Sequence, residues 1–353
     1  METFKAERLY KLTAFLIILV VATAIMIAGA QLLVPLTWAF LFSFVMTPLC
    51  ELLEKKLSRS TSAIIATLVF CAISGLIMFW LIYQAVLILQ NEPVLFEKIK
   101  GGIDRLIASL EIQLGIPVIE TESPITEKNF RDIVGFFARG VSSVGENLIT
   151  ITLIPMYLFF ILNYRGLAQR FIESKFDGDL LAELGTFASK SQLSIRNYLL
   201  GTLILTGVSA AMSFLILLAF GMSYAFFFGV FIAVLNLIPY IGNLMAFAVV
   251  LLFAWVTKDS GVTVLFIGVS LYASNMIQEN FLRPKVIGDK MEMNAMMVFS
   301  AVVVGGMIWG FSGMVLFIPL LGILQALLNS HPAWKPFAIF FETDEKKPKP
   351  VKP

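Results

Sequence analysis

The sequence predicts an all-α, polytopic integral membrane protein with about eight transmembrane helices, a C-terminal helical hairpin that is spanning or re-entrant, and a small helical extracytoplasmic insert. Of the 353 residues, 58% are hydrophobic and 14% are charged, and the mean hydropathy is +0.88. Ordinary soluble domains carry about 25% charged residues. The apolar residues also form runs close to the roughly 20 residues that cross a bilayer.

Eight apolar runs are candidate spans. They lie near residues 13–30, 32–49, 63–89, 147–163, 201–220, 225–241, 243–257 and 261–278. The first run has a basic lead and ends in Ala28-Gly29-Ala30, which also resembles a secretory signal peptide. Because a second run begins directly after Gln31, we expect a retained first helix of a hairpin instead.

The last apolar stretch, residues 295–329, is too long for one straight spanning helix. It could form one bent span, two spans or a re-entrant hairpin. Its helix-breaking or small residues are Gly305, Gly306, Gly310, Gly313 and Pro319. The pair Gly306 and Gly310 equally suits close helix packing.

The distribution of Lys and Arg predicts the orientation. Basic residues gather at the N-terminus, in the 50–62, 165–200 and 280–294 connections, and in the tail. We therefore expect these segments, including both termini, on the cytoplasmic side of the membrane. The 295–329 stretch then enters and leaves on the same side, which favours a hairpin with its turn at Gly310 to Gly313.

We expect five consecutive parts. They are N-terminal transmembrane helices that serve as scaffold (1–90), an extracytoplasmic amphipathic insert (91–146), a transmembrane helix with a cytoplasmic interfacial helix (147–200), a C-terminal transport bundle (201–330) and a partly disordered cytoplasmic tail (331–353). The insert repeats apolar positions at helical spacing but is too small to bury its apolar face alone.

The sequence contains no motif that is typical of an enzyme. The single histidine, His331, follows the last apolar run, and no Gly-rich phosphate loop or close acidic cluster occurs. We therefore expect no enzyme, no cofactor and no metal site. The two cysteines lie in or beside apolar runs, which argues against a disulfide framework, and the net charge of +2 gives no signal for nucleic acid.

Polar residues cluster at the end of the 261–278 run, where they are costly in lipid and tend to line a helix contact or a pathway. Tyr272, Asn275 and Glu279 share one helical stripe, with Gln278 and Asn280 beside it. Pro284 is expected to end this helix and to leave carbonyls before it without partners. Alternatively, the helix simply leaves the membrane and Glu279 pairs with Arg283.

A second polar group occurs in NLIPYIGN, residues 236–243. Pro239 and Gly242 predict a break or tight turn, and Asn236, Tyr240 and Asn243 supply neutral donors and acceptors. A plain turn between helices is one interpretation. The other is a substrate site, because broken helices at membrane depth often line transport cavities.

Residues 236–320 resemble the autoinducer-2 exporter family, also known as PerM-type permeases. The family pattern matches Pro239, Gly242, Asn280, Pro284, Gly288, Gly305, Gly306, Gly310, Gly313 and Pro319. Asn243 stands where the family often has proline, so we expect a less rigid turn. The resemblance implies an inner-membrane transporter linked to quorum sensing or to sodium/proton antiport, assembled as a homo-oligomer, with a pentamer expected.

We therefore expect export of a small polar molecule such as autoinducer-2 by alternating access. Asn236, Tyr240, Asn243, Asn275 and Gln278 would contact the cargo, and Glu279 would bind a coupling proton or sodium ion. Tyr272 and Asn280 complete the expected pathway residues. A cation/proton antiporter and a non-transporting oligomeric scaffold are the alternatives.

Overall fold

The computed structural model describes residues 2–91, 101, 148–175, 178–239, 241–258, 260–287, 293–330 and 334–341. No β-strand occurs in these ranges. Most of the predicted 91–146 insert lies outside them, as do Tyr240, Gly288, His331 and the tail after Phe341.

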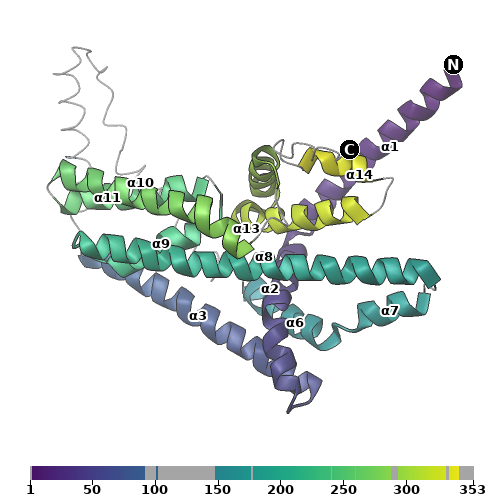
Figure 1. The fold of residues 1–353 in the computed structure, drawn as a ribbon, viewed down its shortest axis with the longest axis horizontal. Helices are drawn as coiled ribbons and strands as arrows, with labels where there is room; N and C mark the ends of the chain where they lie inside the picture. The colour runs from purple at the N-terminus through teal and green to yellow at the C-terminus, as the bar shows by residue number, and fades with distance from the viewer. Residues whose placement is uncertain are drawn as a thin grey trace, which may run out of the picture. The chain divides into compact units, whose positions relative to one another are not determined.

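The described ranges are almost entirely helical (Figure 1). The helices are α1 (Glu2–Ala28), α2 (Ala30–Glu54), α3 (Arg59–Asn91), α6 (Leu148–Tyr164), α7 (Leu167–Lys175), α8 (Gly178–Ala219), α9 (Ala225–Leu235), α10 (Ile241–Thr257), α11 (Gly261–Ile277), the π-helix η1 (Gln278–Leu282), α12 (Arg283–Ile287), α13 (Ala295–Ser330), α14 (Lys335–Ala338) and the 3₁₀-helix η3 (Ile339–Phe341). Within the described ranges, five segments are long and apolar enough to cross a membrane: Ala30–Glu54, Arg59–Ile88, Ile195–Ala219, Gly261–Val286 and Ala295–Asn329. The predicted all-α, polytopic membrane fold is confirmed.

The chain forms two compact units. Unit 1 contains Met1–Leu68, Ile149–Arg196 and Met291–Pro353, and unit 2 contains Val69–Leu148 and Asn197–Lys290. Each unit combines segments that are far apart in the sequence. The division into five consecutive functional parts stays a prediction.

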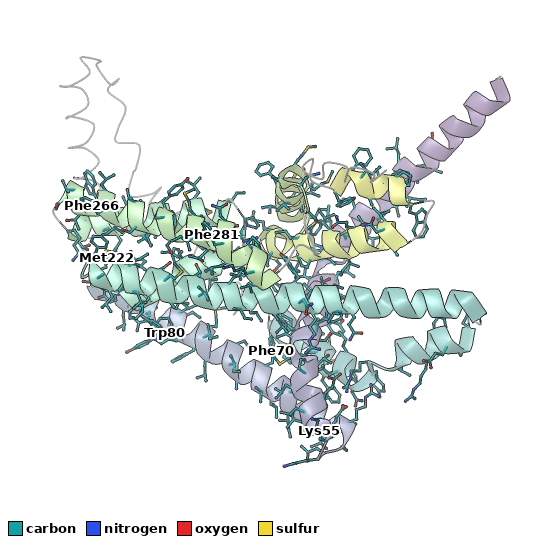
Figure 2. The ribbon with its side chains drawn as sticks, viewed as in Figure 1. Lys55, Phe70, Trp80, Met222, Phe266 and Phe281 are labelled. Atoms are coloured by element: carbon teal, nitrogen blue, oxygen red, sulfur yellow. The ribbon has the colours of Figure 1, made fainter. Side chains whose placement is uncertain are left out.

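Unit 2 has its core around α9 and α10. The buried apolar residues come from α3, the end of α8, α9, α10 and α11, and include Leu217, Phe228, Ile232, Val250 and Leu271. Glycine allows α8 and α9 to approach closely: a Cβ at Gly229 of α9 would lie 2.9 Å from the Ala210 carbonyl oxygen of α8. Figure 2 labels Met222, a core residue, and Phe266 and Phe281, which are exposed and suited to face lipid.

Helices α9 and α10 form a tight helical pair in unit 2. The chain turns between Leu235 and Ile241, and a Cβ at Gly242 would overlap the Leu235 carbonyl. With 11 residues, α9 is about 16 Å long at 1.5 Å per residue, shorter than a bilayer core. At the other ends of the pair, Lys258 Nζ donates to the Gly221 carbonyl at 2.6 Å. The chain therefore enters and leaves this pair at neighbouring points.

Helix α13 is folded back on itself in unit 1. Trp309 (φ −127°, ψ 17°) and Gly310 (φ 58°, ψ −139°) leave the helical conformation. A Cβ at Gly305 would overlap the Gly313 carbonyl, although eight residues of straight helix span about 12 Å. The two arms of α13 therefore pack against each other through glycine, and the predicted C-terminal hairpin is confirmed.

The N-terminal helices differ from the expected hairpin. The Gly29 N–H donates to the Ile25 carbonyl at 2.8 Å, and the Leu33 N–H donates to the Gly29 carbonyl at 2.9 Å. Gly29 itself has φ −88° and ψ 7°, only a modest departure from helix. The chain therefore bends between α1 and α2 instead of reversing, because one slightly distorted residue cannot turn a helix through 180°.

Candidate functional site

The structure brings together two of the predicted polar residues in unit 2. Asn243 lies in the first turn of α10, directly after the close contact at Gly242, and Asn275 lies near the end of α11. The Asn243 Nδ2 donates to the Asn275 Oδ1 at 2.7 Å. The other amide atom, Asn243 Oδ1, is buried and has no hydrogen-bond donor within the described part of the chain. Among the described residues, Asn243 Oδ1 is therefore a hydrogen-bond acceptor without a donor inside an apolar unit.

The helix after Asn275 changes its hydrogen-bonding register. Residues Gln278–Leu282 form a π-helix, in which the Arg283 N–H donates to the Gln278 carbonyl. Gln278 is buried, and its side chain donates to the Ser274 hydroxyl at 3.1 Å. π-Helical turns inside α-helices frequently occur at functional sites.

Pro284 does not end this helix, contrary to the expectation. Helix α12 continues from Arg283 to Ile287, directly after the π-helical turn. The longer i→i−5 register makes room for the proline ring, which would clash with the carbonyl four residues earlier in a regular α-helix. Since proline has no N–H, a carbonyl one turn earlier still lacks that donor.

Glu279 forms a local ion pair with Arg283. Arg283 Nε lies 2.8 Å from Glu279 Oε2, and Arg283 Nη2 donates to Glu279 Oε1 at 2.9 Å. The two side chains are 38% and 40% exposed, so a pair at i,i+4 contributes only about 0.3–0.5 kcal/mol. This is the geometry expected for a helix that leaves the membrane, and the coupling role of Glu279 stays untested.

The remaining described pathway residues differ in their exposure. Tyr272 is 59% exposed, Asn280 is exposed, and Asn236 is half-buried after the end of α9. Tyr240 lies outside the described residues. Pro239 lies in the turn before α10, and Pro319 is buried in the second arm of α13.

The tip of the α13 hairpin is held by two tryptophans that the sequence analysis did not select. Trp309 Nε1 donates to the Met26 carbonyl of α1 at 2.9 Å, and Trp38 Nε1 of α2 donates to the Ser312 hydroxyl at 3.3 Å. The Met26 carbonyl is among the last four of α1, which lack partners within the helix. The hairpin tip therefore bonds to both sides of the bend at Gly29.

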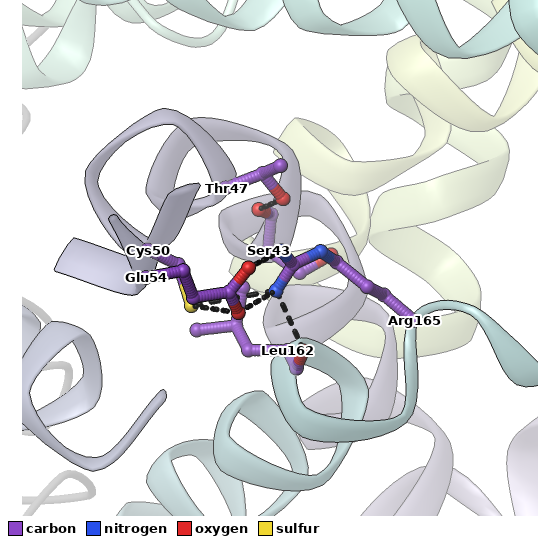
Figure 3. A network of polar contacts seen from close by, with 6 residues as sticks. All are labelled: Ser43, Thr47, Cys50, Glu54, Leu162 and Arg165. Atoms are coloured by element: carbon purple, nitrogen blue, oxygen red, sulfur yellow. Dashed lines mark hydrogen bonds and ion pairs between the residues drawn. The ribbon is translucent and has the colours of Figure 1, made fainter. Parts of the chain in front are cut away.

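A second feature missed from the sequence is a polar network in unit 1 (Figure 3). Arg165, which follows α6, forms a two-pronged ion pair with Glu54 at the end of α2. Its Nη1 also donates to the Leu162 carbonyl at 3.1 Å and lies 3.5 Å from the Cys50 Sγ. Hydrogen bonding to Glu54 raises the pKa of Arg165, so the guanidinium stays charged.

This network has a partial signal in the sequence. Ser43, Thr47, Cys50 and Glu54 recur at helical spacing along one face of α2, and the first three are buried. Nearby, Ser60 Oγ donates to Asn163 Oδ1 at 3.0 Å. The 50–62 connection and the end of α6 therefore lie together in unit 1.

The described residues contain no group of three or more His, Cys, Asp or Glu side chains placed to hold a metal ion. What they do contain is a set of long apolar helices, two tightly folded helix pairs and a neutral polar pair inside one unit. These features are those of a polytopic membrane protein.

Comparison with known proteins gives the family. Residues 16–333 match the family described as "AI-2E family transporter", so the chain belongs to this family. It is similar to "Putative transport protein YrrI" of Bacillus subtilis (strain 168), with 24% identity over 327 residues, covering 84% of this chain and 85% of the relative. A second protein of that organism, "Putative transport protein YueF", is 23% identical over 316 residues, covering 84% and 83%. A "Putative transport protein" of Haemophilus influenzae is 24% identical over 336 residues, covering 89% and 92%.

Proposed function

We propose that this membrane transporter exports a small, neutral, polar molecule, such as autoinducer-2, by alternating access. The observation that carries the proposal is the Asn243–Asn275 pair, with its buried Asn243 Oδ1 that lacks a donor in the described chain. A buried polar atom without a partner costs about 1–3 kcal/mol. A hydroxyl group of the cargo would donate to this oxygen and remove that cost.

A neutral cargo suits this site better than an ion. Amide side chains provide donors and acceptors without a net charge, which matches a polyhydroxylated molecule. Gln278 supplies a further amide besides the two asparagines. It is buried at the start of η1, directly after α11, and donates to the Ser274 hydroxyl. Asn236 and Tyr240, from the segment before α10, are also proposed to contact the cargo.

Glu279 is the proposed coupling residue, for a proton or a sodium ion. It is the carboxylate of the polar segment that ends α11, and its partner Arg283 lies on the next turn. Protonation or sodium binding would have to compete with Arg283, so the ion pair would open in one state and close in the other.

We place the protein in the bacterial inner membrane as a homo-oligomer, with both termini in the cytoplasm and without enzymatic activity. The basic connections support this orientation. Cysteine variants at exposed Lys56 and at the N-terminus, labelled with an impermeant reagent in intact cells, would test it. Reaction of either position from outside the cell would contradict it.

Cation/proton antiport is the second candidate, and Glu279 is the residue that favours it. An assay in proteoliposomes distinguishes the two functions. Antiport moves protons when sodium is added without organic cargo, whereas export requires cargo.

The test uses purified protein in liposomes with an imposed proton or sodium gradient and autoinducer-2 as the cargo. We expect gradient-dependent cargo flux, its loss in Asn243→Ala, and loss of gradient dependence in Glu279→Gln. Asn329→Ala is the matched control, because Asn329 is exposed near the end of α13. Equal flux in Asn243→Ala and Asn329→Ala would exclude the asparagine site, and unchanged gradient dependence in Glu279→Gln would exclude the coupling role.

A further inference from the structure

A short apolar segment follows the α13 hairpin in unit 1. We name residues 334–341 the C-terminal aromatic segment; it contains α14 and η3. Phe337, Ile339 and Phe340 are 58%, 64% and 66% exposed, while Ala338 and Phe341 are buried. The segment therefore packs on its own unit through one edge and presents large apolar side chains on the other.

Asn294 fixes the position of this segment. Its Oδ1 accepts a hydrogen bond from the Met297 N–H at 2.8 Å and so caps the first turn of α13. Its Nδ2 donates to the Phe340 carbonyl at 2.6 Å, and its own N–H donates to the Phe341 carbonyl at 3.0 Å. One side chain and one backbone group therefore tie the segment to the start of α13.

The segment also lies close to the other end of the hairpin. α13 ends at Ser330, four residues before Trp334. Both ends of an apolar hairpin that enters and leaves on one side lie near the boundary of the hydrocarbon layer. The segment is bonded to one end of the hairpin and begins four residues after the other, so with the topology proposed above it lies at that boundary too.

We propose that the C-terminal aromatic segment is a membrane anchor that inserts Phe337, Ile339 and Phe340 into the lipid interface beside the ends of the α13 hairpin. Interfacial segments of membrane proteins present apolar and aromatic side chains to the boundary between headgroups and acyl chains. No charged residue occurs between Lys335 and Glu342, which fits burial in lipid.

The test places a fluorescent label on the full-length protein in liposomes of phosphatidylcholine and phosphatidylglycerol. Cys50→Ala and Cys71→Ala remove the native thiols, and single cysteines at Phe337 or Phe340 carry an environment-sensitive dye. We expect blue-shifted emission, strong quenching by lipids with a nitroxide near the headgroup, and at least threefold weaker quenching by aqueous iodide than at the control position. The control is Lys56→Cys, an exposed site in the connection between α2 and α3.

A second variant distinguishes insertion from burial against protein. Phe337→Glu with Phe340→Glu changes only exposed side chains, so the fold should persist, and a label at Ile339→Cys should then shift toward iodide quenching. Iodide quenching at 337 and 340 equal to that at position 56 would overturn the proposal. Protection from both iodide and lipid quenchers would also overturn it, because the segment would then face a protein surface.

Discussion

The close contact between the two arms of α13 can be tested by adding one methyl group. In Gly305→Ala, the new Cβ would lie 2.7 Å from the Gly313 carbonyl carbon and 2.9 Å from the Phe317 ring. The arms must separate by about 1 Å to restore an ordinary carbon–carbon distance of roughly 3.5–4.0 Å. Overpacking of this kind costs about 1–3 kcal/mol.

The helix propensity of alanine reduces this cost. Gly→Ala inside a helix contributes about 0.5–1 kcal/mol of stability. We therefore expect Gly305→Ala to lower the free energy of unfolding by about 1 kcal/mol, within the range of roughly 0–2.5 kcal/mol that the overpacking cost less this gain allows. Gly75→Ala in α3 makes the same chemical change where no atom lies within 4 Å, so it should leave stability equal or higher.

Unfolding of the purified variants by SDS in mixed micelles, followed by circular dichroism, measures these differences. Gly310→Ala adds a separate comparison. Its Cβ would meet open space, but φ of 58° costs a residue with a side chain about 1–3 kcal/mol. Equal stability of Gly305→Ala and Gly75→Ala would refute the packed hairpin.

Three further predictions concern hydrogen bonds that fix the units. Glu54→Gln should lower the unfolding free energy by about 1–2 kcal/mol, because Arg165 keeps its charge but loses its carboxylate partner. A double-mutant cycle with Arg165→Met should give a coupling energy above zero between the two side chains. Trp309→Phe should cost about 0.5–1.5 kcal/mol in the same unfolding assay through loss of the indole donor, and no change would show that this bond contributes nothing. Lys258→Met should cost less than about 1 kcal/mol because its bond to Gly221 is exposed, and a larger loss would contradict this weak contribution.

Composition and hydropathy were enough to predict the all-helical membrane fold, whereas the α13 hairpin was predicted from its glycines and from the positions of the basic residues. The glycines at 305, 310 and 313 are unusual in an apolar helix, and the basic tail required a return to the starting side. The bend at Gly29 could not be predicted in the same way. A glycine between two apolar runs permits either a reversal or a bend, and contacts with distant residues, such as the bond from Trp309 to the Met26 carbonyl, cannot be read from the local sequence.

The candidate site was predictable only in part. Asn243 and Asn275 stood out because amides are rare and costly in apolar helices. Their direct hydrogen bond depends on how α10 packs against α11, and the spacing of residues along one helix gives no information about that packing. The effect of Pro284 was mispredicted because a π-helical turn can accommodate proline, and the Glu54–Arg165 pair was missed because its partners are 111 residues apart.

A double-mutant cycle on transport tests the central claim most directly. Autoinducer-2 uptake would be measured in inside-out vesicles for the wild type, Asn243→Ala, Asn275→Ala and the double variant, at matched protein levels. If the two amides hold one cargo molecule, each single variant should lower uptake at low cargo concentration about tenfold, equivalent to roughly 1.4 kcal/mol, and the double variant should be little worse than either. A shared cargo site would be contradicted if every variant took up cargo as fast as the wild type. It would also be contradicted if the fold-loss of the double variant equalled the product of the two single fold-losses.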